Sequence, residues 1–135
     1  MNGSNLEKVV VDTNIIFMAL YNPYSKAGEI INTAFLNKIK LFSTDSVKEE
    51  IIRVLKHEMN LSDIEINKII LSLPITWINK EIYINQLKNT KVKHKPDKPI
   101  EALAITLNCG ILSGDKHFKN RMDINILLRN LINKQ

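Results

Sequence analysis

The segment Lys8-Val9-Val10-Val11-Asp12-Thr13-Asn14 gives the first indication of the fold. Its three consecutive valines are β-branched, and a short continuous apolar run of this kind is typical of a strand buried on both faces of a parallel sheet. The run stops at Asp12. Ligands of open α/β sheets bind just beyond the carboxyl ends of the strands, so Asp12 is the first candidate for a functional residue.

Outward from this strand, helical stripes and short apolar runs alternate along the chain. Apolar spacing predicts helices after Ser25, from Ser46 to about Met59, after Ser62, over residues 79–90, and from Ile100 to a stop at Gly110. Further strands are predicted at residues 41–42, 75–78, 111–113 and 124–127. This alternation predicts an α/β fold, a three-layer α/β/α sandwich with a mainly parallel sheet of about five strands.

Composition limits the class of protein. The chain has 135 residues, 44% apolar and 24% charged, which is typical of one folded domain spanning residues 1–135. The N-terminus lacks the charged-then-apolar layout of a signal peptide, and no apolar stretch is long enough for a membrane span, so we expect a cytoplasmic protein that does not contact membranes. The single cysteine, Cys109, excludes an intramolecular disulfide.

The net charge is positive. A formal charge of +5 and a pI of about 9.3 favour encounter with polyanions such as RNA or DNA. Many basic proteins bind no nucleic acid, so this charge becomes informative only where it lies beside a chemically active group.

Four acids should meet at one edge of the predicted sheet. Asp12 ends the first strand, and Asp115 comes two residues after the strand at 111–113. Crossover helices start at the same edge, where Glu50 and Asp97 belong to the beginnings of two predicted helices. We select Glu50 over Glu49 because it borders the apolar stripe of its helix, whereas Glu49 points outward and suits a capping box with Ser46.

Taken singly, each of these acids has an ordinary structural interpretation. Asp12 and Asp115 could begin turns, and Asp97 could cap the helix that Pro99 enters. Taken together, carboxylates about 4 Å apart would repel by roughly 4 kcal/mol at the effective dielectric of a protein surface. An all-oxygen cluster suits Mg²⁺ or Mn²⁺ rather than zinc, so a divalent cation is the predicted cofactor.

The order of these residues resembles the PIN-domain family of ribonucleases, in particular its small prokaryotic toxin-like (VapC-type) branch. The resemblance rests on Val9-Val10-Val11-Asp12-Thr13-Asn14, Glu50-Ile51-Ile52-Arg53-Val54-Leu55, Asp97 seven residues before Ala104, and Ser113-Gly114-Asp115-Lys116-His117-Phe118. It implies a PIN-like fold and a divalent-metal-dependent endoribonuclease that hydrolyses phosphodiester bonds.

The resemblance also implies roles for single residues. Asp12, Asp97 and Asp115 would bind Mg²⁺ or Mn²⁺, and Glu50 would complete the cluster and help to orient the attacking water. Asn14 and Ser113 would support the metal ligands. The chain has His94-Lys95-Pro96 and His117 where many relatives carry further acids, so the resemblance leaves the number of metal ions open.

Basic and aromatic residues near the acids are candidates for contacts with substrate. Lys95, Lys116 and His117 could meet RNA phosphates, as could Lys91, Lys93, Lys98, Lys119 and Arg121, although a solvated surface explains any one of them equally well. Phe17, Tyr21 and Tyr24 could stack on bases, but core or interface packing is the favoured interpretation. Glu101 shares a helix face with Asp97, and we expect it to be partly exposed.

Other functions fit parts of the pattern. A phosphatase of the haloacid-dehalogenase type would need an aspartate at the position of Asn14. A catalytically silent PIN-like module that binds RNA or protein, and a housekeeping RNA-processing nuclease, both stay open. If the chain is the toxin of a toxin–antitoxin pair, the resemblance implies three partners, namely an RNA substrate, a small antitoxin protein and a second copy of the chain.

Overall fold

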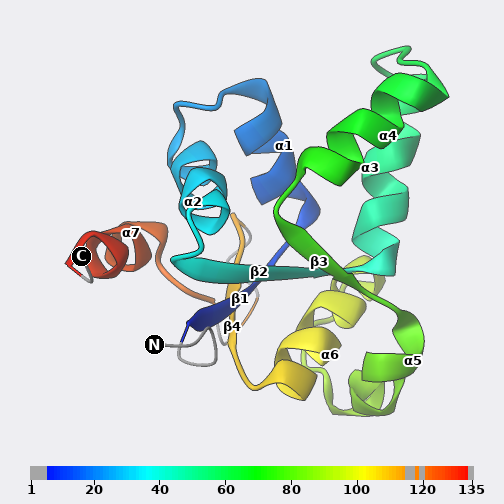
Figure 1. Ribbon diagram of the computed structural model, residues 1–135. Coiled ribbons are helices and arrows are strands. Elements are labelled where there is room, and N and C mark those ends of the chain that lie inside the picture. The colour runs from blue at the N-terminus through cyan, green and yellow to red at the C-terminus, as the bar shows by residue number, and fades with distance from the viewer. Residues whose placement is uncertain (1–5, 115–117, 119–120, 134–135) are drawn as a thin grey trace.

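The computed structural model describes residues 6–114, 118 and 121–133, and a parallel sheet lies at its centre (Figure 1). Its strands are β1 (Glu7–Val11), β2 (Ile39–Thr44), β3 (Ile75–Ile78) and β4 (Gly110–Leu112), in the order β3-β2-β1-β4. All neighbouring strands pair in parallel. Val9, Val10 and Val11 are completely buried in β1, which confirms the predicted central strand.

Helices cover both faces of the sheet. One face carries α1 (Thr13–Tyr21), α2 (Lys26–Phe35), α3 (Asp45–His57) and α4 (Asp63–Ser72), and the other carries α5 (Lys80–Tyr83) and α6 (Lys98–Leu107). The chain moves outward from β1 to β2 to β3 and then returns to β4, so right-handed crossovers place the two groups of helices on opposite faces. This arrangement confirms the α/β/α sandwich. In the described part of the chain, no helix has the length and apolar character needed to cross a bilayer.

Side-chain caps explain where several helices begin. Asp12, Ser25, Thr44 and Ser62 each accept a hydrogen bond from a backbone N–H in the first turn of the helix that follows. Ser62 and Glu65 form a complete capping box. The cap of α3 is Thr44, so the predicted capping box of Ser46 with Glu49 is wrong.

One hydrogen-bonded contact joins the two helical layers. Asp45, the first residue of α3, accepts hydrogen bonds from the Lys80 backbone N–H at 3.1 Å and from the Tyr83 hydroxyl at 2.6 Å. Burial and the bond to Asp45 raise the pKa of Tyr83, so its hydroxyl remains a donor at neutral pH. The start of α3 is therefore tied to α5, which packs against α6.

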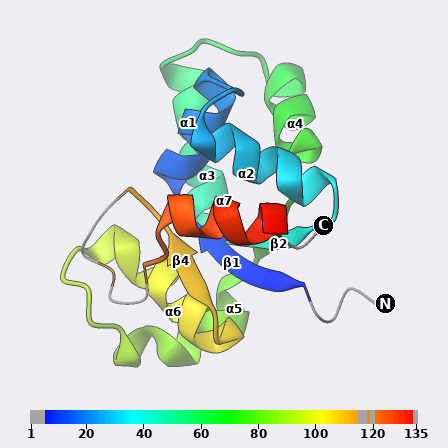
Figure 2. The same ribbon diagram turned by 90° about the vertical axis from the view of Figure 1, so that its left-hand side faces the viewer.

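The predicted strand at residues 124–127 is wrong, because these residues begin helix α7 (Ile124–Asn133). Asp123 accepts hydrogen bonds from the N–H groups of Asn125 and Ile126, and Leu127 and Leu131 are buried one turn apart. The helix lies beside α2 (Figure 2). Ile124 and Ile126 mimic the alternation of a strand, but the four-residue spacing of the buried leucines decides the structure.

Three smaller expectations also need correction. Helix α1 follows Asp12 directly, although no helix was predicted between Asp12 and Ser25. Residues 79–90 divide into the short α5 and a 3-10 helix, Ile84–Asn89, and a second 3-10 turn spans Lys95–Asp97. Helix α6 ends at Leu107 and is capped by Asn108, which adopts the left-handed conformation at φ 52°, while Gly110 is the first residue of β4.

Gly28 lies close to the backbone of Pro23. A Cβ atom added to Gly28 would lie 2.1 Å from the backbone oxygen of Pro23, so replacement by alanine requires the backbone to shift. We expect Gly28→Ala to lower the free energy of unfolding by about 2 kcal/mol or more, as overpacking typically does. Urea denaturation measures this change. Gly114→Ala is the matched control because nothing lies within 4 Å of its added Cβ, and equal stability of the two variants would contradict the prediction.

Candidate active site

Asp12 is positioned by the pairing of β1 with β4. Val11 pairs with Leu112, so Asp12 and Ser113 leave the sheet side by side, and the Ser113 hydroxyl donates a hydrogen bond to Oδ2 of Asp12. Oδ1 of Asp12 accepts the backbone N–H of Ile15 at 3.0 Å. Asp12 therefore caps α1, and the residue is only 6% exposed.

Glu50 reaches the site from α3. The buried Ser43 hydroxyl donates to the backbone oxygen of Val11 at 2.6 Å, which ties the carboxyl ends of β1 and β2 together just before Thr44 caps α3. Glu50 then pairs with Arg53 at 2.9 Å, and both side chains are about half exposed. The hydrogen bond and charge of Glu50 raise the pKa of Arg53, which keeps the guanidinium charged.

Asp97 lies at the start of α6 but does not cap it. Among the described residues, its carboxylate makes no capping hydrogen bond, and its buried Oδ2 accepts no hydrogen bond at all. His94 Nδ1 approaches Oδ2 to 3.3 Å, which is an ion-pair distance if the imidazole is protonated, without the geometry of a hydrogen bond. A buried acceptor without a donor is costly, so this oxygen is suited to a cation.

One cleft of about 450 Å³ brings three of the four predicted acids together. Asp12, Glu50 and Asp97 line it along with Asn14, whereas Glu49 does not. Ser113 is not part of the cleft lining but donates its hydrogen bond to Asp12. Lys95 is exposed and does not line the cleft either. Asp115, Lys116 and His117 lie outside the described residues.

Positive groups offset part of the repulsion between these acids. Asp12 and Asp97 lie at the N-termini of α1 and α6, where the helix dipole stabilises negative charge. Arg53 pairs with Glu50. The described residues contain no group of three or more His, Cys, Asp or Glu side chains arranged to hold a metal ion. Their carboxylate oxygens nevertheless match the preference of Mg²⁺ and Mn²⁺.

Comparison with known protein families identifies this architecture. A family model described as the PIN domain matches residues 10–121. The chain belongs to the PIN-domain family. The matched stretch contains all four predicted acids, and PIN domains are generally nucleases.

A solved structure agrees with the fold of this PIN domain. The crystal structure of VapBC2 from Rickettsia felis, bound to a DNA fragment from their promoter, contains a chain that is similar with a TM-score of 0.58. The two chains share 17% sequence identity, and the match covers 85% of this chain and 96% of that chain. No curated protein matches the sequence.

Several residues of the site were not singled out from the sequence. His94, Pro96, Ser46 and Ile100 line the cleft, and their placement depends on how the 91–97 segment folds against α3 and α6. Glu101 is the clearest error, because it is 4% exposed instead of partly exposed. Its Oε1 accepts the backbone N–H groups of Lys91 and Val92 at 2.6 and 3.0 Å. No sequence pattern indicates such a long-range contact with backbone.

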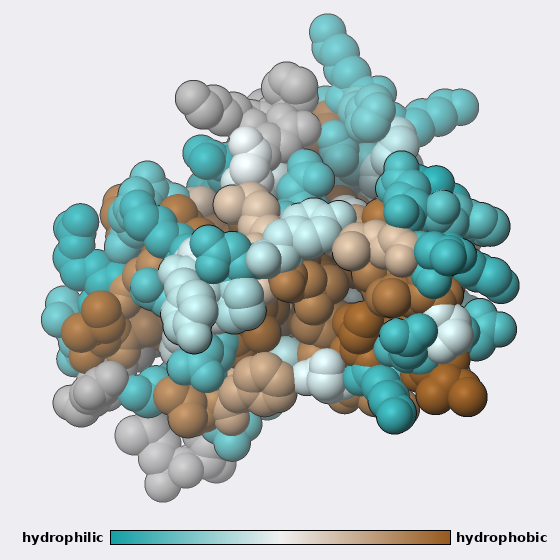
Figure 3. All heavy atoms as spheres, turned by 90° about the horizontal axis from the view of Figure 1, so that it is seen from above, coloured by the Kyte–Doolittle hydropathy of each residue, from teal (hydrophilic) through white to brown (hydrophobic). Residues whose placement is uncertain are grey.

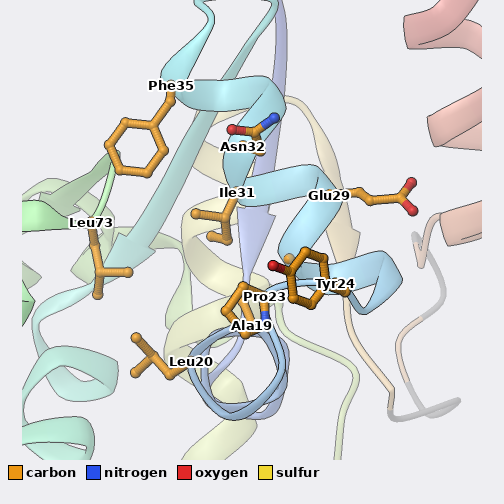
Figure 4. A pocket seen from close by; sticks show the side chains of 10 residues that line it. Ala19, Leu20, Pro23, Tyr24, Glu29, Ile31, Asn32, Phe35 and Leu73 are labelled. Atoms are coloured by element: carbon orange, nitrogen blue, oxygen red, sulfur yellow. The ribbon is translucent and has the colours of Figure 1, made fainter.

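A second, apolar hollow of about 520 Å³ lies between α1, α2 and the end of α4 (Figure 4). Leu20, Ile31, Phe35 and Leu73 contribute to its wall, and Tyr24 at its rim is 92% exposed. Apolar side chains are also exposed between hydrophilic ones on the face of the molecule seen from above (Figure 3). Phe17 stacks on Tyr21 and packs against the core, in agreement with the interpretation favoured for it.

The bond between Ser113 and Asp12 can be tested by stability. Ser113→Ala removes a buried hydroxyl donor, so we expect the free energy of unfolding to fall by about 1–2 kcal/mol. Ser113→Thr keeps the hydroxyl and serves as the matched variant, with a smaller loss. Urea denaturation of both variants measures the difference, and a Ser113→Ala protein as stable as the wild type would contradict a supporting role.

Proposed function

We propose that this PIN domain is a divalent-metal-dependent endoribonuclease. The observation that carries the proposal is the cleft in which Asp12, Glu50 and Asp97 converge, with the buried Oδ2 of Asp97 accepting no hydrogen bond from the described residues. Membership of a family of nucleases favours phosphodiester hydrolysis over other metal-dependent reactions. Preference for RNA over DNA rests on the family resemblance, since attack by water needs no 2′-hydroxyl.

The carboxylates would divide the work. Asp12 and Asp97, together with Asp115, would hold Mg²⁺ or Mn²⁺. When bound, the cation would lower the pKa of water and offset the charge that develops on the phosphate. Glu50, which comes from α3, would exchange its pairing with Arg53 for a hydrogen bond to the attacking water. The products would carry 5′-phosphate and 3′-hydroxyl ends.

Supporting residues would orient these groups and the substrate. Ser113 holds Oδ2 of Asp12 through its hydroxyl, which leaves the carboxylate little rotational freedom. Asn14 lines the cleft from the first turn of α1, where its exposed amide could bind a phosphate oxygen. We further propose that Lys95, Lys116 and His117 contact the RNA backbone.

We also propose a small antitoxin protein as a partner, and a homodimer as the assembled form. The similarity to a chain of VapBC2 supports a toxin–antitoxin role, and the apolar hollow between α1 and α2 offers a surface that a partner could cover. Co-purification with the product of a neighbouring short reading frame, followed by loss of RNA cleavage in the complex, would support this role.

The nuclease proposal predicts that Asp12→Asn abolishes RNA cleavage in Mn²⁺ while the protein stays folded. Asparagine caps a helix as well as aspartate does, so α1 should persist, but the charge needed for the cation is lost. Mapping of new 5′ ends in total RNA measures cleavage, and circular dichroism measures folding. Glu49→Gln, one residue outside the cleft lining, is the control and should cut normally. Undiminished cleavage by Asp12→Asn, or by wild type in excess EDTA, would overturn the mechanism.

Metal binding can be measured without RNA. Mn²⁺ in hundredfold excess over its dissociation constant should stabilise the wild-type protein by about 2.7 kcal/mol, because it binds only the folded state. In thermal unfolding, Mn²⁺ should therefore raise the Tm of the wild type and of Glu49→Gln. The Tm of Asp97→Asn should rise much less. An equal rise in Asp97→Asn would show that the cation binds elsewhere.

A further inference from the structure

A second cavity adjoins the catalytic cleft. It has a volume of about 420 Å³ and is lined by Lys91, Val92, Lys93, His94 and Asp97. His94 and Asp97 also line the catalytic cleft, so the two cavities meet at these residues. A ligand bound in one cavity would therefore lie next to the other.

The charge of the second cavity is positive. Residues 91–101 contain four lysines and two carboxylates, and Lys91 and Lys93 are exposed in the lining itself. Neither of these lysines forms an ion pair with any described residue. Their ammonium groups are available to an anion, and a backbone phosphate is the anion that a nucleic acid would present next to the cleft.

The backbone under these lysines is held in place by α6. Residues 90–92 belong to no helix or strand, so their backbone groups need other partners. Glu101 accepts the N–H groups of Lys91 and Val92, and the Lys98 ammonium donates to the backbone oxygen of Val92 at 3.0 Å. Both polar backbone groups of Val92 are thus bound by side chains from the first two turns of α6, and its own side chain is buried.

This clamp, formed by Glu101 and Lys98, explains why a carboxylate is buried outside the catalytic cleft. Burial of a charged group is costly unless hydrogen bonds replace its hydration. Glu101 receives two such bonds, and both of them fix the position of residues 91 and 92. A lysine on a fixed backbone loses less conformational entropy on binding than one on a mobile loop.

From these observations we infer that the second cavity is a subsite for an RNA phosphate next to the one that is cut, with Lys91 and Lys93 as its ligands and Glu101 as a positioning residue. The inference rests on the proposed function, because it takes the adjoining cleft to be the place of cleavage. Acidic segments of a protein could also meet these lysines, but a cavity that shares Asp97 with the catalytic cleft favours the substrate itself.

The test measures RNA binding apart from cleavage. All variants are made in the Asp12→Asn background and bound to a short fluorescent single-stranded oligoribonucleotide in EDTA, over a series of salt concentrations. Lys91→Ala/Lys93→Ala should weaken binding about fivefold or more and reduce the salt slope by about 0.7 for each phosphate that is no longer neutralised. Lys40→Ala/Lys68→Ala removes two exposed lysines from β2 and α4, outside both cavities, and should leave the slope nearly unchanged.

Glu101 is tested by two substitutions and a second readout. Glu101→Gln keeps the Oε1 acceptor and should preserve binding, whereas Glu101→Ala should lower it as the double lysine variant does. A lysine-specific protease should cut Glu101→Ala faster after Lys91 and Lys93. Glu101→Gln should stay as resistant to this protease as its parent. Equal loss of binding in both Glu101 variants would refute the clamp, because it would mean that the negative charge itself is required.

Each outcome separates this inference from the nuclease proposal. If wild type cuts RNA but the Lys91/Lys93 variant binds like the Lys40/Lys68 control, the subsite is wrong and the nuclease stands. If binding depends on Lys91 and Lys93 but no RNA is cut in Mn²⁺, the site binds RNA and the proposed activity is wrong. If the Asp12→Asn parent binds no RNA, the subsite is wrong. It is also wrong if Lys91 and Lys93 are needed to bind an acidic peptide but not to bind RNA.

Discussion

Complete burial of Val9, Val10 and Val11 between two layers of helices is the constraint on which the rest of the structure depends. A strand in this position must pair on both edges, and β1 does so with β2 and β4 in parallel register. Asp12, which follows β1, then lies at the edge of the sheet where β2 and β4 also end and where α1 and α3 begin. Asp12 therefore also has a structural role, because one of its carboxylate oxygens caps α1 and the other accepts a hydrogen bond from the Ser113 hydroxyl.

The acids of the cleft differ in how firmly the protein holds them. Asp12 has partners on both oxygens, while Glu50 is half exposed and pairs with Arg53 on its own helix. Such an exposed pair contributes little to stability, so Glu50 can change partners at small cost. Asp97 lies between these cases, since its Oδ2 is buried but accepts no hydrogen bond from the described residues. The protein thus holds Asp12 firmly, buries an oxygen of Asp97 that accepts no hydrogen bond from the described residues, and leaves Glu50 able to move, which suits the metal-dependent site proposed above.

Topology made most of the site predictable. A buried strand, an amphipathic α3 and the start of α6 could be placed from apolar spacing, and the carboxyl edge of a parallel sheet then brings Asp12, Glu50 and Asp97 together. Helix α1 was missed because Ile15, Ile16 and Phe17 form an unbroken apolar run with no visible polar face. The strand expected at 124–127 was wrong because Ile124 and Ile126 imitate the alternation of a strand, although Ile124 packs against the core and only Ile126 is exposed. The predicted exposure of Glu101 was wrong for a different reason. Its hydrogen-bond partners are backbone N–H groups ten and nine residues away, and a backbone group gives no signal in the sequence.

The contact of Asp45 with Lys80 and Tyr83 bears on how the cleft can move. Glu50 extends from α3 on one face of the sheet, Asp97 lies just before α6 on the other, and Asp45 links α3 to α5, the neighbour of α6. A hinge that opened the cleft by swinging these faces apart would have to break those bonds as well as deform the sheet. We therefore expect the walls of the cleft to move little relative to each other, so that an RNA strand of the kind proposed above would have to adapt its own backbone to the cleft.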